Sequence, residues 1–322
     1  MRAGQLDLLQ NIVEQVAPLS RAKQKLLESA DLVHFEAPDA QDLAFLAREF
    51  VQCTMPHKDP GPIPGWGRTN GFLALGITPG FDFLHKRSIG FPYGSIPRLI
   101  LYWVNTEAVR TASRRLELGS SFADFIRSLG LDPSRGGPRS DHARVKNQLE
   151  RLLCASITFQ SSLQKDGLMG EHRMNLQVSS QSQLWWDPKK PEQVSLWDSW
   201  IELGEGFYQL ITAAPVPVDL RALRALKKSP LALDLYAWST HKALSVSRKG
   251  KAQFVPWKGL MEQFGADYTD PHNFKKKAKE ALKKIQAVYP GLKLEDAVGG
   301  LVVLPSSRPA IASKPSRRGI TG

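Results

Sequence analysis

The spacing of hydrophobic residues changes along this chain, and each change marks an element. Apolar positions three and four apart predict helices over residues 95–110, 122–129 and 141–154. Apolar positions that alternate with polar ones predict strands at 116–118, 156–162 and 173–186. The predicted order of this first unit is therefore helix, strand, helix, loop, helix, hairpin.

The same order recurs after the turn-rich segment 187–191. The hydrophobic pattern predicts strands at 196–203 and 254–257 and a hairpin over 292–304. It predicts helices at 207–212, 229–247, 258–264 and 271–289, and one more that begins at 219. The two units share a pattern rather than an obvious sequence. A repeated helix-turn-helix followed by a β-hairpin predicts an α+β fold of tandem winged-helix domains.

The start of the chain follows a different pattern. Residues 1–60 carry helically spaced apolar positions, among them a second set running from Leu43 to Val51. The prolines and glycines of 55–67 predict a linker or extended arm, and strands are expected at 72–77 and 81–85. We expect an N-terminal helical arm and linker (1–62), two winged-helix domains (63–190 and 191–305) and a disordered basic tail (306–322).

Composition is consistent with a two-domain globular protein. The chain has 322 residues, of which 42% are hydrophobic, and its longest strongly apolar run, 99–104, is far shorter than the ~20 residues that span a bilayer. The first residues lack the apolar stretch of a signal peptide, so we expect a cytoplasmic protein without membrane attachment. The two cysteines, Cys53 and Cys154, give no disulfide or zinc pattern, and Cys154 is expected to be buried.

Positive charge gathers in the last quarter of the chain. The formal net charge is +12, and residues 241–322 contain 16 Lys and Arg against 6 Asp and Glu, so that +10 of it lies there. Six of these basic residues fall within one patterned helix, against four in the tail. This asymmetry predicts a polyanionic partner, with a merely solubilising tail as the alternative.

The segment 270–289 is the strongest candidate for the contact with that partner. Asp270 can cap a helix that Pro271 begins, and an apolar stripe from Phe274 to Val288 fixes the docked side. Six lysines face a single acid, Glu280, and like charges at this spacing destabilise a free helix. We predict a recognition helix in the DNA major groove, the alternatives being contact with phosphates alone or a solvated face. Its predicted DNA-binding residues are His272, Asn273, Lys275, Lys276, Lys279 and Lys283.

The predicted helix 141–154 is a weaker candidate. Its polar side mixes basic residues with Asp141 and Glu150. Contact with the DNA backbone or a partner subunit is as consistent with this mixture as an ordinary exposed helix. The candidate residues, including two in the preceding loop, are Arg135, Arg139, Arg144, Lys146, Asn147 and Arg151.

Several motifs of enzymes are missing from the sequence. There is no Walker-type phosphate loop, no nucleophile elbow, and no metal-binding spacing among the seven histidines. The acidic pairs Glu202/Glu205 and Glu295/Asp296 are interpreted as solvated. We therefore expect no catalytic site, no cofactor and no metal.

Six ordered strings of the sequence resemble the RepA-type plasmid replication initiators of bacteria. The resemblance spans about residues 65–305, and its strings are FPYGSIPRL (91–99), NTEAVRT (105–111), WWDP (185–188), PVDLRAL (217–223), SPLALDLYAW (229–238) and FGADY (264–268).

The resemblance implies a protein that binds repeated duplex sites (iterons) at a plasmid origin. Such initiators help to open an adjacent A·T-rich segment, recruit the host replication initiator and replicative helicase, and as dimers repress their own promoter. By this analogy the first winged helix supplies dimer and backbone contacts, and the second contacts bases. A DNA-binding repressor or partition-type protein without a replication role remains an alternative, as does a DNA-cleaving enzyme such as a nickase.

Overall fold

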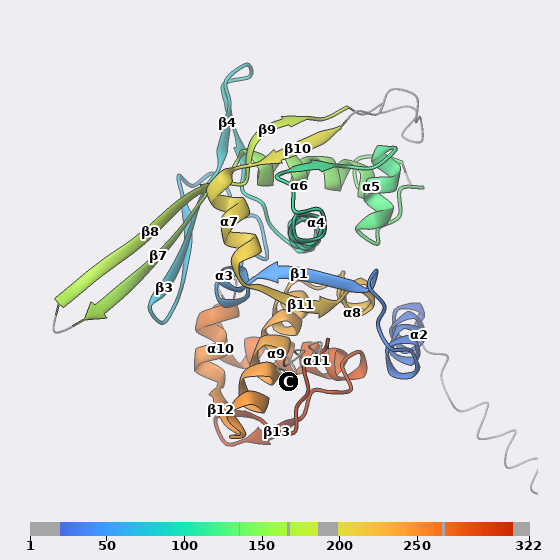
Figure 1. The fold of residues 1–322 in the computed structure, drawn as a ribbon, viewed down its shortest axis with the longest axis vertical. Coiled ribbons are helices and arrows are strands. Elements are labelled where there is room, and N and C mark those ends of the chain that lie inside the picture. Colours follow the sequence, from blue (N-terminus) through green and yellow to red (C-terminus); the bar gives the residue numbers. More distant parts are fainter. Residues whose placement is uncertain (1–19, 135, 166–167, 186–198, 266–267, 312–322) are drawn as a thin grey trace, which may run out of the picture.

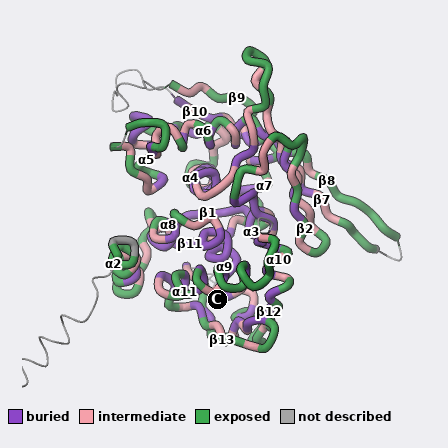
Figure 2. The backbone as a smooth tube through the Cα atoms, turned by 180° about the vertical axis from the view of Figure 1, so that it is seen from behind, coloured by how far each residue is buried: buried purple, intermediate pink, exposed green. Residues whose placement is uncertain are grey.

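Two strands that are far apart in the sequence pair at the centre of the molecule, between an upper and a lower lobe (Figure 1). They are β1 (Leu43–Ala47) and β11 (Pro215–Asp219), antiparallel along their full length. The computed structural model describes residues 20–134, 136–165, 168–185, 199–265 and 268–311. Buried residues concentrate on β1, β11 and the two long helices that flank the pair (Figure 2).

The lower lobe has the element order expected for the second unit. Its strands form one antiparallel sheet in the order β12-β14-β13, so that the first strand of the three pairs with the last. The elements are α9 (Pro230–Lys249), β12 (Gln253–Pro256), α10 (Trp257–Phe264), α11 (Pro271–Ala287), β13 (Leu294–Ala297) and β14 (Gly300–Val303).

The upper lobe repeats this arrangement with different strands from those expected. The sheet order is β6-β10-β9, again with the first strand paired to the last. The elements are α4 (Ser95–Thr111), β6 (Arg115–Glu117), α5 (Phe122–Ser128), α6 (Asp141–Cys154), β9 (Ser179–Gln183) and β10 (Trp200–Leu203). The predicted α+β fold class is thus confirmed, and the structure adds that its sheets are small and antiparallel.

Two strand assignments from the sequence are wrong. The second strand of the hairpin expected over 156–186 is divided. β7 (Ser156–Lys165) and β8 (Leu168–Gln177) pair as a hairpin, but within a four-stranded sheet with β2 (Trp66–Asn70) and β3 (Leu73–Thr78), whereas β9 joins the sheet of the upper lobe. The strand expected to open the second unit is β10, which pairs with β6 and β9 of the upper lobe. Periodicity identifies a strand but does not specify its partner, which is fixed by tertiary packing.

The helical pattern expected through Leu43–Val51 is also wrong. The segment forms β1 and then the short helix α3 (Arg48–Gln52). β1 pairs with β11, and the free backbone N–H groups of Phe45 and Ala47 donate to Thr106 Oγ1 (2.9 Å) and Asn105 Oδ1 (2.8 Å) of α4. The backbone groups of β1 therefore find hydrogen-bond partners on both edges of the strand. These tertiary contacts outweigh the local preference for a helix that the spacing of apolar residues indicates.

A buried charge network joins the lobes. Arg98 of α4 donates through Nε and Nη2 to Asp234 of α9 at 2.7 and 2.8 Å, and His57 Nε2 lies 2.8 Å from the same carboxylate. Burial opposes the charge of Asp234, but the Arg98 guanidinium and the hydrogen bonds of Arg98 and His57 hold its pKa well below the ordinary value. Burial lowers the pKa of His57, and its hydrogen bond to Asp234 partly opposes that shift. The segment expected to be a linker or extended arm is thus packed into the protein at His57, which is buried.

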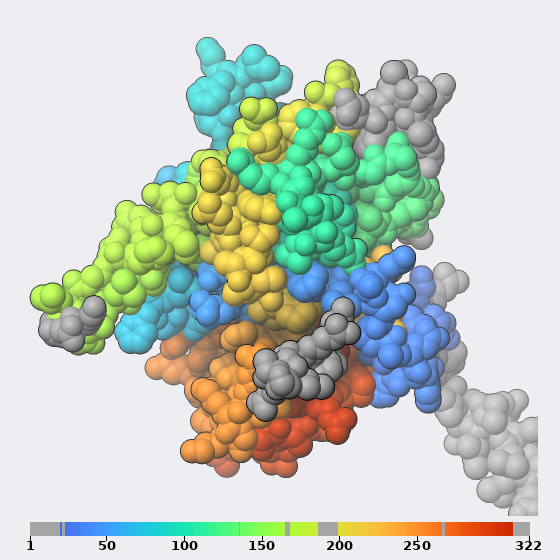
Figure 3. Space-filling model, viewed as in Figure 1, coloured from blue at the N-terminus to red at the C-terminus, as the bar shows by residue number. Residues whose placement is uncertain are grey.

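The remaining elements pack against the outside of the two lobes or project from them. α2 (Arg21–Phe35) packs on α8 (Leu220–Leu226), and α7 (Glu205–Ala213) packs on α4. The ribbon of β4 (Gly80–Asp82) and β5 (Arg87–Gly90) stands clear of the upper lobe, as does the β7–β8 hairpin at the side (Figure 3). No helix among the described residues is long and apolar enough to span a bilayer.

Two further expectations differ from the structure. The tail expected from residue 306 begins with a packed segment, in which Ser307 is buried and the Tyr289 hydroxyl donates to the Arg308 carbonyl at 2.7 Å. Cys154 is exposed, because the buried stripe of its helix ends at Leu153. Residues 312–322 of the predicted tail and 1–19 of the predicted arm lie outside the described residues.

Candidate nucleic-acid interface

α11 begins and docks as its sequence predicts. The Asp270 side chain accepts hydrogen bonds from the backbone N–H groups of His272 (3.0 Å) and Asn273 (3.1 Å), and Pro271 occupies the first turn. One side of the helix packs on α9 and α10. The buried residues on that side are Phe274, Ala278, Ala281, Leu282 and Ile285. This stripe fixes which side of α11 faces solvent.

Most of the predicted reading residues share that solvent face. His272, Asn273, Lys275, Lys276 and Lys283 are all exposed. The single acid of the helix, Glu280, pairs with Lys277 at 2.9 Å. Within the described parts of the chain, the structure shows no ion pair for Lys276 or Lys283. The face therefore presents positive charge that the described protein does not neutralise.

Lys279 differs from its neighbours, because it bridges the helix to the hairpin of β13 and β14. Its ammonium lies 2.9 Å from Asp296 Oδ1, and its side chain is 38% exposed. The ammonium also lies 5.8 Å from the centre of the Trp257 ring, and that of Lys275 lies 6.0 Å from it. Lys279 is thus held in one orientation over a groove of about 220 Å³ between α11 and β13.

The partner of Lys279 was missed by sequence reasoning. Asp296, interpreted from the sequence as half of a solvated acidic pair with Glu295, lies 17 positions beyond Lys279. No local spacing signals this contact, since it depends on how the β13–β14 hairpin folds back over α11. The hairpin tip itself, Val298-Gly299, is exposed, and Gly299 has a φ of +77° that suits a tight turn.

α6 occupies the position in the upper lobe that α11 occupies in the lower. The Ser140 hydroxyl caps it by accepting from Ala143 N–H. Arg144 is exposed but pairs with Asp141 at 3.0 Å, and Asn147 faces solvent. Lys146 is half-buried, while Arg139 is exposed in the loop before the helix. Arg135, the sixth candidate, lies outside the described residues.

Arg151 belongs to the interior packing of the upper lobe. Its Nη1 donates to Asp59 Oδ2 at 3.0 Å and to the Phe91 carbonyl at 3.1 Å. The guanidinium lies 5.3 Å from the centre of the Tyr93 ring, and the side chain is only 17% exposed. The structure therefore separates Arg151 from the solvent-facing candidates of α6 and gives it a role in packing.

The described residues contain no group of three or more His, Cys, Asp or Glu side chains placed to hold a metal ion.

Comparison with known proteins gives one family and two similar structures. The family model described as "Plasmid encoded RepA protein" matches residues 91–259. A crystal structure of RctB domains 2-3 is similar with a TM-score of 0.45 and 11% identity, covering 79% of this chain and 94% of that one. A selenomethionine structure of domains 2 and 3 of RctB gives a TM-score of 0.48 and 12% identity, covering 85% and 97%. No curated protein matches the chain.

Proposed function

Since this chain belongs to the family of plasmid-encoded RepA proteins, we propose that it initiates plasmid replication by binding iterons, repeated double-stranded sites at the origin. The observation that carries this proposal is the solvent face of α11, where Lys276 and Lys283 lie without an ion pair among the described residues. Phosphates of a duplex would neutralise that face, and the groove floor would offer base edges to it.

Each lobe is proposed to be a winged helix. The support is the repeated order of helix, strand, helix, helix and two strands, with the first strand paired to the last in both lobes. In this arrangement the third helix enters the major groove and the hairpin lies beside it. α6 and α11 are the third helices, and the β9–β10 and β13–β14 pairs are the wings. We keep 63–190 and 191–305 as the proposed domains, with the exception that β10 completes the first wing.

The residues of α11 divide by position along the helix. Lys276, Lys279 and Lys283 lie one turn apart on the polar side and are proposed to meet base edges or the phosphates next to them. His272 and Asn273 lie in the first turn, where the partial positive charge of the helix N-terminus adds attraction for a phosphate. Lys275 lies at the edge beside Trp257 and is proposed as a backbone contact.

The upper lobe is proposed to hold the duplex without reading it. Arg139, Arg144, Lys146 and Asn147 are the proposed contacts to the sugar-phosphate backbone, and the same lobe is proposed to dimerise. The resemblance supports the later steps: opening of an A·T-rich segment, recruitment of the host replication initiator and replicative helicase, and autorepression by the dimer. None of these roles needs a catalytic residue or a cofactor in this chain.

The alternative is a DNA-binding repressor without a replication role, and plasmid maintenance separates the two. To test initiation, the gene with its flanking DNA is placed on a vector whose own origin is inactive in the host. To test repression, the gene and a reporter driven by its promoter are placed on a separate vector that replicates from its own origin. An initiator yields transformants, and Lys276→Ala with Lys283→Ala abolishes them while Lys25→Ala on α2 does not. Repression of the reporter with no transformants from the unaltered gene would favour the repressor.

A further inference from the structure

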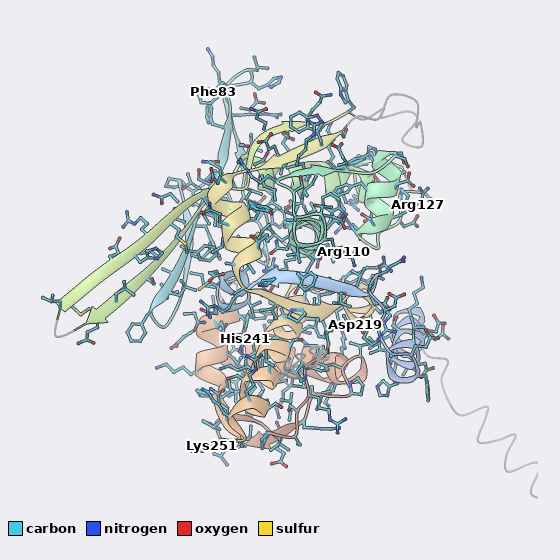
Figure 4. The ribbon with its side chains drawn as sticks, in the orientation of Figure 1. Phe83, Arg110, Arg127, Asp219, His241 and Lys251 are labelled. Carbon is cyan, nitrogen blue, oxygen red and sulfur yellow. The ribbon has the colours of Figure 1, made fainter. Side chains whose placement is uncertain are left out.

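The ribbon of β4 and β5 ends in an apolar tip that nothing in the described chain covers. Phe83 is 84% exposed and Leu84 is 91% exposed, and Phe81 beside them is 49% exposed. Figure 4 shows Phe83 at the outermost end of the ribbon, well away from the body of the upper lobe. Exposed apolar area costs about 25 cal/mol for each Å², so a cluster of this size favours a partner that buries it.

The tip is held in place rather than loosely tethered. The Asp82 carboxylate accepts hydrogen bonds from the backbone N–H groups of Leu84 and His85, both at 3.1 Å, and lies 2.6 Å from His85 Nδ1. The rings of Phe81 and Phe83 pack edge to face with their centres 5.2 Å apart. The apolar side chains are therefore presented in a fixed arrangement.

The ribbon is also anchored against α6. At Gly80 a Cβ atom would lie 2.5 Å from the Cys154 Cβ, and at Gly90, with a φ of +88°, it would lie 2.9 Å from the Arg151 guanidinium. Glycine at both roots thus allows the strands to approach the C-terminal part of the helix closely. The ribbon projects from the same helix whose exposed polar residues are proposed to hold the DNA backbone.

Charge at the tip favours a nucleic acid over a protein partner. Lys86 and Arg87 lie just beyond the apolar residues and both are exposed, while Asp82, the one acid of the ribbon, lies 3.6 Å from Arg87 Nε, so that these three side chains together carry a net positive charge. An apolar wedge flanked by cations matches the minor groove, where side chains such as Phe and Leu can enter between base pairs while phosphates line both sides.

We propose that the β4–β5 ribbon is a second DNA-binding element, which inserts Phe83 and Leu84 into the minor groove next to the stretch of backbone contacted by α6. Lys86 and Arg87 bind the flanking phosphates, and the inserted side chains unstack one base step and bend the duplex. The inference rests on the proposed function, because α11 supplies the sequence-dependent contact that positions the ribbon.

The first test measures bending of a duplex recovered by selection with the full chain from a random pool. Donor and acceptor dyes at its two ends report the bend by energy transfer. We expect the unaltered protein to raise the transfer, and Phe83→Ala with Leu84→Ala to leave the duplex straight and to bind it about tenfold more weakly. Phe72→Ala, at another hairpin turn where the side chain is 82% exposed, is the matched control and keeps the bend.

The second test uses the same duplex with a one-nucleotide gap beside the site, which removes most of the cost of unstacking. The unaltered protein should bind the gapped duplex several-fold more tightly than the intact one, and the Phe83/Leu84 variant should bind both alike. If the variant bends the intact duplex as the unaltered protein does, or keeps the preference for the gap, the ribbon is not a wedge and its tip serves another partner such as a protein.

The two proposals fail in different ways. Lys276→Ala with Lys283→Ala removes selective binding altogether, whatever the ribbon does. Selective binding by the unaltered protein without any bend overturns the wedge alone. A protein that selects no duplex overturns both.

Discussion

α6 and α11 hold the same place in the two lobes, yet they differ in what happens to their charges. α11 carries six lysines and one acid, and most of the lysines extend into solvent. α6 carries three basic and two acidic residues, of which Arg144 pairs with Asp141 and Arg151 is committed to Asp59 and Phe91. Position in a repeated arrangement therefore does not fix a helix's role. The charge left over after internal pairing is the difference on which we propose α11 as the base-reading helix and α6 as a supporting one.

The largest effect is expected when the buried charge network between the lobes, which supports both helices, is broken. Asp234→Ala leaves Arg98 buried without its partner, and breaking a buried pair in this way costs about 3–5 kcal/mol of unfolding free energy. Urea denaturation measures the loss. Both lobes should be weakened together, so that the transition stays single; separate transitions for the two lobes would contradict a shared frame.

The same network predicts a loss of stability in acid. His57 has a lowered pKa in the folded protein, so the unfolded chain takes up a proton more readily, and stability falls as the pH drops through about 6.5. The Asp234 pKa is also lowered, so its contribution is present above about pH 4 and is lost as the pH falls further. His57→Gln should diminish the first of these two phases in a series of denaturation curves and leave the second. Burial also lowers the pKa values of His142 and His241, so part of the first phase should remain.

Next in size is the loss of DNA binding on substitution in α11. Lys276→Ala and Lys283→Ala should each weaken selective binding by about 1–3 kcal/mol if the lysine meets a base. The free energy of unfolding should not fall, because both side chains are exposed. Titration of labelled duplexes measures the effect. An equal loss on every sequence would make that lysine a phosphate contact.

Arg151→Ala should lower stability without changing sequence selectivity, the converse of the α11 substitutions. Removing the guanidinium leaves the Phe91 carbonyl and the Asp59 carboxylate without this donor, which we expect to lower the free energy of unfolding by about 1.5–3 kcal/mol. Sequence selectivity should be unchanged under conditions where the variant is folded. A shift in the selected sequence with stability retained would place Arg151 at the DNA instead.

The exposed residues of α6 should give smaller effects. Arg144→Ala and Lys146→Ala are each expected to weaken binding equally on all sequences. If each residue contacts one phosphate, each substitution should also reduce the steepness of the salt dependence by about 0.9 in a plot of log K against log salt. An unchanged slope would mean that α6 is an ordinary exposed helix.

The smallest effect is expected at the contact between α11 and its wing. Asp296→Asn removes the carboxylate that holds Lys279 and repels phosphates, and exposed pairs of this kind are worth about 0.2–1 kcal/mol. Binding to unrelated duplexes should therefore tighten by a few-fold, with a lower ratio of selective to non-selective affinity. Glu295→Asn is the matched control, since the structure shows no ion pair for Glu295 among the described residues.

Local signals in the sequence were enough to predict both helices. The apolar stripe places α6 at its observed bounds, and the Asp270 cap with its own stripe places α11 at the right start, because each signal depends on residues within a few positions. The pairing of β1 with β11 and of β10 with β6 joins residues about 170 and 85 positions apart, and no local spacing specifies such partners. For the same reason the sequence does not predict the contacts of Arg151 with Asp59 and of Lys279 with Asp296, which form only when the lobes fold.

The most direct test of the base-reading role of α11 is selection from a random duplex pool at about 0.15 M salt, run in parallel with three proteins. These are the unaltered chain, the chain with Lys276→Ala and Lys279→Ala, and the chain with Arg144→Ala and Lys146→Ala. We predict one enriched motif for the unaltered chain, its loss with the α11 variant and its retention, at lower affinity, with the α6 variant. Retention of the motif by the α11 variant, or no enrichment by the unaltered chain, would contradict the account.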